Sequence, residues 1–267
     1  MANEYARRNM LEKYLNFIKD EETKNTVKKI ADKGSVVSKN YIPEATEFMN
    51  HRAIELSIAV IENNNIKFEI FPSYEHSERK VFILYPIYSN IEINDFLCGI
   101  RIHNKSKFKK LDHRDYLGAL MSLGIERNRT GDIYVYSTYA DIIVHREISD
   151  YIVYNLDKVG NNKVETEIIK LEEVSYKEQE HKIMNINSSS MRLDNIVKHI
   201  TNSSRDKAAA IVKSGKVKVN YLPEEKVSFE LKEDDLLSIS KWGRFKIHRI
   251  NGRTRSGRIK IEIKHYI

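Results

Sequence analysis

The sequence predicts an α+β protein made of three consecutive regions, and three observations support this fold class. Residues 96–171 alternate strand and helix patterns in the order β-α-β-β-α-β, residues 192–220 indicate two short helices and a strand, and residues 1–88 mix helices with strands. The chain has 267 residues, of which 41% are hydrophobic and 31% charged, a composition typical of ordered globular domains. We expect domains at residues 1–88, 89–180 and 188–267.

The first region is expected to be a small α+β unit. Apolar residues at helical spacing predict a helix over residues 5–33, with a break at 20–23 and a stop at Gly34. Pro43 can open a second helix that runs toward residue 63. Two strands follow, at residues 66–71 and 81–85.

The second region has the element order of a ferredoxin-like (RRM-like) β-α-β-β-α-β sandwich. Strands are expected at residues 96–102, 132–136, 140–144 and 164–171, with helices at 112–123 and 148–156. Single-strand RNA readers of this topology stack bases on aromatic side chains. Tyr134, Tyr136 and Tyr139 are available here, but the glycine-aromatic signature of those readers is absent. We therefore do not expect sequence-specific base stacking.

The third region opens with two short helices, a glycine turn and a strand. Apolar residues at helical spacing mark the first helix: Leu193, Ile196, Val197 and Ile200. Ser203 or Ser204 can cap the second helix, and Gly215 is placed to end it in a left-handed turn. Val217 and Val219 then alternate with lysines, which is typical of a strand with one basic face.

The second helix of this region suggests an anion site. A helix that opens with Ser204 and Arg205 offers backbone N–H groups and a guanidinium at one place, and both favour a phosphate. The alternative is a helical hairpin with an ordinary solvated lysine face. The candidate RNA-binding residues of the third region are Arg192, Ser204, Arg205, Lys207, Lys213, Lys216, Lys218, Asn220, Arg244, Arg253, Arg255 and Arg258.

The net charge of +7 is unevenly distributed along the chain. Residues 192–267 contain 18 Lys and Arg against 9 Asp and Glu, whereas residues 1–191 contain 27 against 29. The third region therefore carries +9 and the rest of the chain −2. This distribution indicates a polyanion-binding module on a nearly neutral body.

The end of the chain continues the third region as strands and a basic hairpin. Strands are expected at residues 227–231 and 236–239, after a polar linker at 185–190. Arg253, Arg255 and Arg258 lie in a hairpin with glycines, which suits contacts to a nucleic-acid backbone. Trp242, the only tryptophan, is expected to pack rather than to stack on bases.

The motifs of the third region resemble a small RNA-binding fold named after ribosomal protein S-four. The matching positions are Arg192-Leu193-Asp194, Ser204-Arg205, Ala208, residues 215–220 and residues 235–239. The resemblance implies that the two arginines and nearby lysines grip structured RNA. Asp194 is expected to orient a neighbouring base or to cap a helix.

A second basic stretch lies between the first strand and helix of the second region. We expect a second phosphate contact there, with a solvated loop as the alternative. Its candidate residues are Arg101, Lys105, Lys107, Lys109, Lys110, His113 and Arg114. His113-Arg114-Asp115 is not a kinase catalytic loop, because Leu120 stands where that motif needs Asn and no glycine-rich loop precedes it. Gly118 is expected to permit close packing.

Motifs outside the third region extend the resemblance to the whole chain. Residues 113–120, 123–127, 131–133, 242–245 and 257–261, together with Glu78-Arg79, are similar to the signature of the YlmH family of bacterial RNA-binding proteins. Residues 71–74 depart from it, since the family carries a glycine pair before the aromatic residue. The resemblance implies action on the large ribosomal subunit and its tRNA in rescue of stalled translation, with rRNA, tRNA and other rescue factors as partners. It also implies a genomic link to cell division.

The sequence contains no catalytic signature, so we expect a protein that is not an enzyme. Nucleotide-binding loops, a nucleophile elbow and a His-Glu-x-x-His motif are absent, and we expect no cofactor, metal or small-molecule substrate. Cys98, the only cysteine, should be a buried strand residue. No apolar run is long enough for a bilayer and residues 1–8 lack a signal-peptide core, so we expect a cytoplasmic protein without a membrane partner. Two alternatives stay open: an RNA-modifying or RNA-cleaving enzyme with a site in residues 1–190, tested first at His113, Asp115 and Glu126, or a division-site scaffold.

Overall fold

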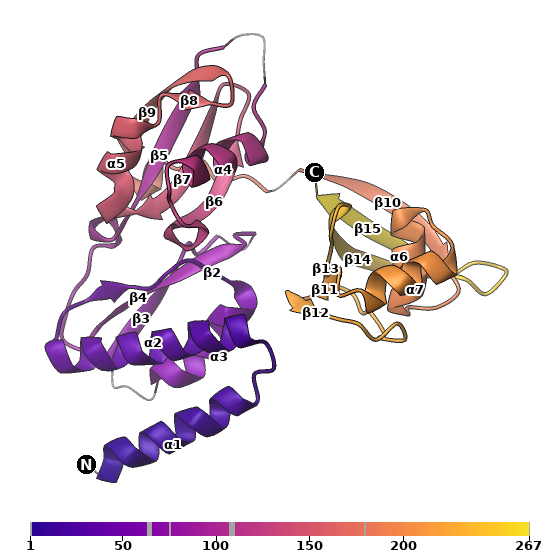
Figure 1. The fold of residues 1–267 in the computed structure, drawn as a ribbon, viewed down its shortest axis with the longest axis horizontal. Coiled ribbons are helices and arrows are strands. Elements are labelled where there is room, and N and C mark those ends of the chain that lie inside the picture. Colours follow the sequence, from indigo (N-terminus) through magenta and orange to yellow (C-terminus); the bar gives the residue numbers. More distant parts are fainter. Residues whose placement is uncertain (1, 63–65, 75, 107–109, 179, 267) are drawn as a thin grey trace. The chain divides into compact units, whose positions relative to one another are not determined.

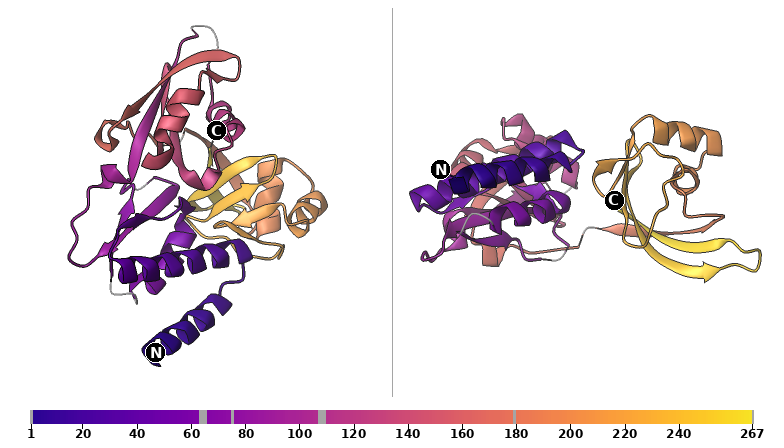
Figure 2. Two further views of the ribbon diagram at one scale, coloured as in Figure 1. Left: turned by 60° about the vertical axis from the view of Figure 1, so that its left-hand side comes forward. Right: turned by 90° about the horizontal axis from the view of Figure 1, so that it is seen from below.

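The computed structural model describes residues 2–62, 66–74, 76–106, 110–178 and 180–266, and it confirms the α+β class. The chain divides into two compact units, Met1–Lys177 and Glu178–Ile267. Figure 1 shows the elements of each unit, and Figure 2 shows the same elements from two further directions. Among the described residues, no helix combines the length and apolar character that a membrane crossing requires.

The first part of the first unit contains three helices: α1 (Ala2–Asn16), α2 (Glu21–Asn40) and α3 (His51–Ile61). The predicted break between the first two is a cap, because the Asp20 carboxylate accepts the Thr23 N–H at 2.8 Å. Gly34 does not stop α2, and the prediction of a stop there was wrong. It lies buried on the stripe that runs on to Val37, and the helix ends at Tyr41, whose φ is +59°.

The first sheet is formed by β1 (Glu44–Ala45), β2 (Met49–Asn50), β3 (Ile66–Phe71) and β4 (Arg79–Pro86). The prediction that Pro43 opens a helix was wrong, because the residues after it pair with β4, Glu44 opposite Leu84. The helix begins later, where Asn50 caps it by accepting the Ala53 N–H. The two later strands were predicted correctly.

The second sheet confirms the ferredoxin-like order. Its elements are β5 (Leu97–Asn104), α4 (His113–Ser122), β6 (Thr130–Val135), β7 (Tyr139–His145), α5 (Ser149–Asn155), β8 (Lys158–Val159) and β9 (Asn162–Ile169). The strands lie in the order β6-β7-β5-β9-β8. Helices α4 and α5 cover one face through a core that contains Tyr116, Leu120 and Ile152 (Figure 1). Cys98 is buried in β5, as predicted.

The two sheets of the first unit share a core, because β4 is buried on both of its faces. Phe82 and Leu84 pack under α2 and α3, whereas Val81 and Ile83 pack against the second sheet. A polar bond crosses the same boundary: Arg79 Nε donates to the carbonyl of Thr130, the first residue of β6, at 3.2 Å.

Asp132 adds a second polar link across this boundary. Its carboxylate accepts the Glu78 N–H at 2.8 Å. Burial raises the pKa of Asp132 to about 6, and the charge of Glu78 adds to that rise. Glu78-Arg79 therefore joins the two sheets, although the sequence offered it only as a family motif.

The second unit is a six-stranded antiparallel sheet with two helices. Its elements are β10 (His181–Ser188), α6 (Leu193–Thr201), α7 (Arg205–Lys213), β11 (Val217–Val219), β12 (Leu222–Pro223), β13 (Leu236–Ile239), β14 (Gly243–Arg253) and β15 (Ile259–Tyr266). The strand order is β10-β15-β14-β13-β11-β12. Leu193, Val197 and Val212 bring the helices onto a core completed by Phe245 and Ile263.

Two expectations for this unit were wrong. The stretch at 185–190, predicted as a linker, is mostly β10, which pairs with β15 from His181 opposite Tyr266 to Ser188 opposite Ile259. Met184 and Ile186 alternate toward the core, and this signal was hidden among polar neighbours. The strand predicted at 227–231 is a turn followed by one isolated bridge, between Glu230 and Arg192.

Two glycines give opposite predictions for stability. A Cβ on Gly99 would lie 2.6 Å from Ile169 Cγ1 and 2.7 Å from Val174 Cγ2, whereas a Cβ on Gly118 meets nothing within 4 Å. Among the described residues, none therefore packs closely enough to require glycine at position 118, contrary to the expectation. We expect Gly99→Ala to lower the free energy of unfolding by about 1–3 kcal/mol. Gly118→Ala should raise it by about 0.5–1 kcal/mol, since alanine favours a helix interior.

Urea denaturation of both variants beside the wild type measures these changes. A Gly99→Ala variant as stable as the wild type would contradict the tight contact between β5 and residue 174.

Candidate nucleic-acid interface

A buried carboxylate lies between two of the predicted RNA-binding arginines. Asp194 is 3% exposed and accepts a fork from Arg192, with Nε to Oδ1 at 3.1 Å and Nη2 to Oδ2 at 3.0 Å. Arg205 Nε donates to the same Oδ2 at 3.4 Å. Asp194 thus orients two basic side chains, which come from the residue before α6 and the first residue of α7. We call Arg192, Asp194 and Arg205 the arginine triad.

The charges in the triad hold Asp194 ionised. Burial alone would raise the pKa of Asp194, but the hydrogen bonds and charges of Arg192 and Arg205 outweigh it and lower the pKa below its usual range. The bond to Asp194 raises the pKa of Arg192 in turn. The side chains of Arg192 and Arg205 remain 33% and 64% exposed, so both guanidiniums reach solvent from an anchored position.

The N-terminus of α7 adds polar groups beside Arg205. Ser204 caps the helix, as one of the two sequence alternatives predicted, and its Oγ accepts the Lys207 N–H at 3.3 Å. Ala208 is fully buried and fixes this turn against the core. Ser204 and Lys207 are exposed, as are Lys213, Lys216 and Lys218 farther along. This end of the helix suits an anion by its dipole and its basic side chains.

Asn220 has a structural role in the turn after β11. Its φ is +47°, its amide oxygen accepts the Leu236 N–H at 2.9 Å, and its amide nitrogen donates to Asp235 at 2.8 Å. These bonds fasten the turn to the start of β13. A contact from this side chain to RNA would have to compete with them.

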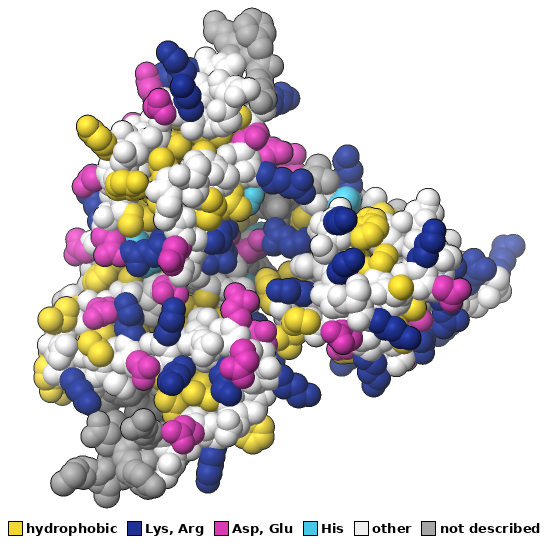
Figure 3. Space-filling view, in the orientation of Figure 1, with side chains coloured by type: hydrophobic (Ala, Val, Ile, Leu, Met, Phe, Trp, Pro, Cys, Tyr) yellow, Lys and Arg dark blue, Asp and Glu magenta, His cyan; other side chains and the backbone are white. Residues whose placement is uncertain are grey.

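The remaining predicted residues of the second unit lie on β14 and the loop after it. Arg253, Arg255 and Arg258 are exposed, and Arg244 is half-buried. Dark-blue side chains crowd the tip of this unit in Figure 3, where the loop between β14 and β15 projects in Figure 1. Trp242 is 37% exposed, so the expectation that it packs holds only in part.

The charge of Arg258, in this loop, also influences His199 on α6. Burial lowers the pKa of His199, and the charges of Lys198 and Arg258 lower it further. Arg258 is thus within electrostatic reach of α6.

In the first unit, two residues of the second basic stretch, Arg101 and Lys105, are engaged within the protein. Arg101 forms a fork with the fully buried Asp141, both distances being 2.8 Å, and this pairing raises the pKa of Arg101. Lys105 pairs with Glu165. Lys107 and Lys109 lie outside the described residues. Lys110 and Arg114 are exposed and His113 is half-buried, at the start of α4.

The open face of a ferredoxin-like sheet, where RNA readers stack bases, is covered here. The Tyr136 hydroxyl donates to the Ser175 carbonyl at 2.7 Å, and the Ser175 N–H donates to Asp141 at 2.9 Å. Tyr136 and Tyr139 stack on each other with ring centres 4.7 Å apart. Tyr134 is 6% exposed and lies 3.2 Å from the Ser77 hydroxyl. The chain's own residues occupy the sites that bases would need, a feature that sequence reasoning missed.

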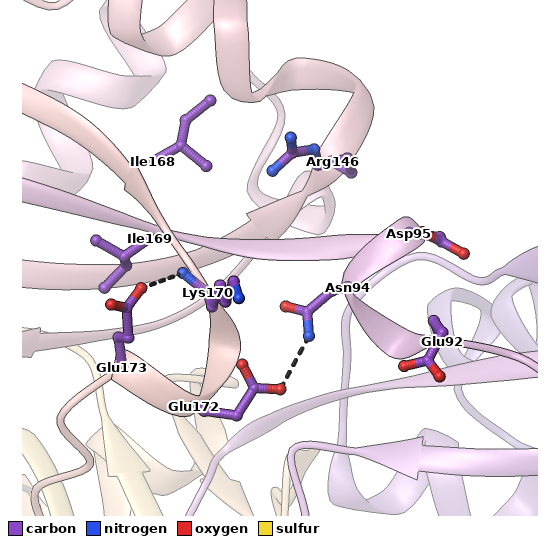
Figure 4. A pocket seen from close by; sticks show the side chains of 9 residues that line it. All are labelled: Glu92, Asn94, Asp95, Arg146, Ile168, Ile169, Lys170, Glu172 and Glu173. Carbon is purple, nitrogen blue, oxygen red and sulfur yellow. Dashed lines mark hydrogen bonds between the residues drawn. The ribbon is translucent and has the colours of Figure 1, made fainter.

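One depression on the first unit is lined by more acidic than basic side chains, which is the wrong balance for RNA. It measures about 1120 Å³, and its lining includes Glu92, Asp95 and Glu172 as well as Arg146 and Lys170. Figure 4 shows these side chains and the bond from Asn94 to Glu172. No group of three or more His, Cys, Asp or Glu side chains among the described residues could hold a metal ion.

Comparisons with known proteins found two matching families, one in each unit. Residues 92–173 match the family described as a putative RNA-binding domain in YlmH, and residues 191–237 match the S4 domain. The chain is 32% identical over 227 residues to the ribosome-associated protein quality control protein P2 of Bacillus subtilis (strain 168), covering 85% of this chain and 88% of that protein. A solved structure, the cell division protein ylmH from Streptococcus pneumoniae, aligns with 59% of this chain and 96% of its own at 26% identity and a TM-score of 0.49.

The triad gives a prediction for stability and its pH dependence. Asp194→Asn removes the charge that both arginines face, and we expect it to lower the free energy of unfolding at pH 7 by about 1–3 kcal/mol. The folded-state pKa of Asp194 lies below its unfolded value of about 3.9, so the ionised group stabilises the fold above that pH. This contribution is lost as the pH falls through the folded-state pKa, so the wild type and the variant should converge in acid.

The matched control is Asp206→Asn, an exposed acid in the first turn of α7, which we expect to cost less than about 1 kcal/mol. Urea denaturation from pH 7 to well below the unfolded pKa of about 3.9 measures both variants. Equal losses in the two would contradict a special role of Asp194.

Proposed function

This chain belongs to the YlmH family of RNA-binding proteins, and we propose that it is a non-catalytic factor that binds the large ribosomal subunit and its tRNA during ribosome-associated quality control. The membership rests on the 32% identity across 85% of the chain. The curated relative's name, a ribosome-associated quality-control protein, supports the choice of process.

The arginine triad is the observation that carries the proposal. Guanidinium groups bind phosphates as planar forks, and anchoring them beforehand lowers the entropy lost on binding. Asp194 supplies that anchor while Arg192 and Arg205 remain partly exposed. The capped N-terminus of α7 beside them offers further donors to the same phosphate backbone.

The charge distribution supports folded RNA as the ligand. With an excess of +9 in residues 192–267, phosphate contacts would supply most of the affinity, which should fall steeply as salt rises. The covered tyrosines of the first unit argue against base readout on its sheet. Selectivity would then come from RNA shape and from contacts made by more than one part of the chain.

We predict that Arg192→Ala with Arg205→Ala abolishes cosedimentation with large ribosomal subunits at physiological salt, because both anchored guanidiniums are lost. Circular dichroism should show that the fold survives. Since this variant leaves Asp194 without partners, a second variant, Arg205→Gln with Lys207→Gln, keeps the Arg192–Asp194 fork intact. It should weaken binding roughly tenfold and lower the slope of log K against log salt by about one per lost contact.

The control for this experiment is Lys226→Gln with Lys232→Gln, which removes the same charge from exposed side chains that are not members of the triad. Sedimentation of all variants at the wild-type level would count against the proposal.

The proposal also predicts the outcome for the enzyme alternative. Asp115 is committed to a capping box with Asp112, whose carboxylate accepts the Asp115 N–H at 3.0 Å while Asp115 accepts the Asp112 N–H at 2.9 Å. We expect mass analysis of rRNA and tRNA from a deletion strain to show every modification retained. A modification that disappears, and returns only with an intact His113, Asp115 and Glu126, would favour an enzyme instead.

A further inference from the structure

The tip of the β14–β15 hairpin is a cationic segment without any acidic residue. Between residues 250 and 261 the chain has four basic residues and no Asp or Glu. They are Arg253, Arg255, Arg258 and Lys260, and all four are exposed. Nearer the base of the hairpin, Glu262 stands opposite Arg249 in the strand register, so local charge compensation ends where the tip begins. We call residues 250–260 the arginine arm.

The arm extends beyond the sheet to which it belongs. β10 follows β15 only as far as Ser188 opposite Ile259, and the pairing of β14 with β15 ends at Arg253 opposite Ile259. Past that pair only the loop remains, and Figures 1 and 2 show it projecting from the unit. The strand register shifts twice along β14, between Ile247 and Arg249 and between Ile250 and Arg253, and such irregularities increase the twist of a ribbon.

Bonds within the loop give the arm a defined shape. The Thr254 N–H donates to the Arg258 carbonyl at 2.7 Å, and the Gly257 N–H donates to the Thr254 carbonyl at 2.9 Å. Arg253 Nη1 reaches across to the Gly257 carbonyl at 2.8 Å. Gly257 has a φ of +79°, which an L side chain rarely adopts. These bonds are all internal, so the arm does not need a ligand to become ordered.

The composition of the tip selects the kind of partner. Residues 251–258 comprise arginines, Asn, Gly, Thr and Ser, with no aromatic and no apolar side chain. Single-stranded RNA is held largely by stacking on aromatic side chains, and stable membrane anchoring takes apolar groups in addition to basic ones. Arginine, serine, threonine and asparagine instead suit the phosphates and 2′-hydroxyls displayed by a base-paired RNA helix.

We propose that the arginine arm binds the phosphates along a groove of base-paired RNA, as a contact separate from the arginine triad. This inference rests on the function proposed above. It adds that the RNA contacted by the arm is a base-paired helix. The arm lies outside the segment that matches the S4 domain, which ends at residue 237. Because it recognises backbone shape, the contact should be insensitive to base sequence.

The test compares two triple variants of the full chain that lose equal charge. The arm variant is Arg255→Gln, Arg258→Gln and Lys260→Gln, which keeps the Arg253 bond to Gly257. The control variant is Lys182→Gln, Lys226→Gln and Lys232→Gln, at exposed positions outside the arm and the triad. The probes are an RNA hairpin of about 20 base pairs with arbitrary sequence and a single-stranded oligouridine of the same nucleotide length. Thermal melting checks that both variants fold as the wild type does.

We expect the arm variant to lose at least about tenfold in affinity for the duplex, with a salt slope lower by about three, one for each basic residue removed. Its affinity for oligouridine should change no more than that of the control. Equal losses in the two variants, equal losses on the two probes, or tighter binding of the wild type to phosphatidylglycerol vesicles than to the duplex would overturn the arm proposal. A wild type that binds neither RNA would instead overturn the proposed function.

Discussion

The buried carboxylate of Asp194 is the constraint on which the second unit's candidate interface depends. A carboxylate that is 3% exposed must be compensated, and the two arginines that compensate it come from the starts of two different helices. Satisfying one buried charge therefore brings the guanidiniums of Arg192 and Arg205 to the same carboxylate, while the shared core holds α6 and α7 together. The bonds that stabilise the buried carboxylate also orient the two guanidiniums. An RNA phosphate would therefore meet side chains that the folded protein already holds in place.

A second constraint shapes the first unit, namely that β4 is buried on both faces. Packing β4 against the second sheet covers part of the face that a ferredoxin-like domain usually presents to RNA. Residues 174–176 cover more of it, through Ser175 and Tyr176. The second sheet thus acts as a structural platform, and any RNA contact of this unit would come from its helices and loops.

The sequence predicted the elements whose signals are local. Alternation and helical spacing gave the ferredoxin-like order, and capping residues gave the start of α7 at Ser204. The errors occurred where pairing partners far along the chain decide the outcome. Residues 44–45 form a strand because β4 is beside them, and β10 forms because β15 offers a full row of partners. Neither pairing is visible in the residues of the shorter segment itself. The prediction of a helix end at Gly34 was wrong because the residues after it continue a buried stripe of the same helix.

Local sequence also fails to show pairing partners in the candidate site, where arginine has two different roles. Arg101 and Arg255 both looked like cations of basic loops, yet Arg101 stands directly opposite the buried Asp141 in the strand register and is bound to it. Arg255 lies in a loop without acidic residues and is exposed. The difference depends on whether a buried acid faces the arginine across the sheet, which requires the register rather than the composition. Charge counts therefore show which unit holds the excess of basic residues, while only the three-dimensional pairing separates arginines that hold the fold together from arginines available to a polyanion.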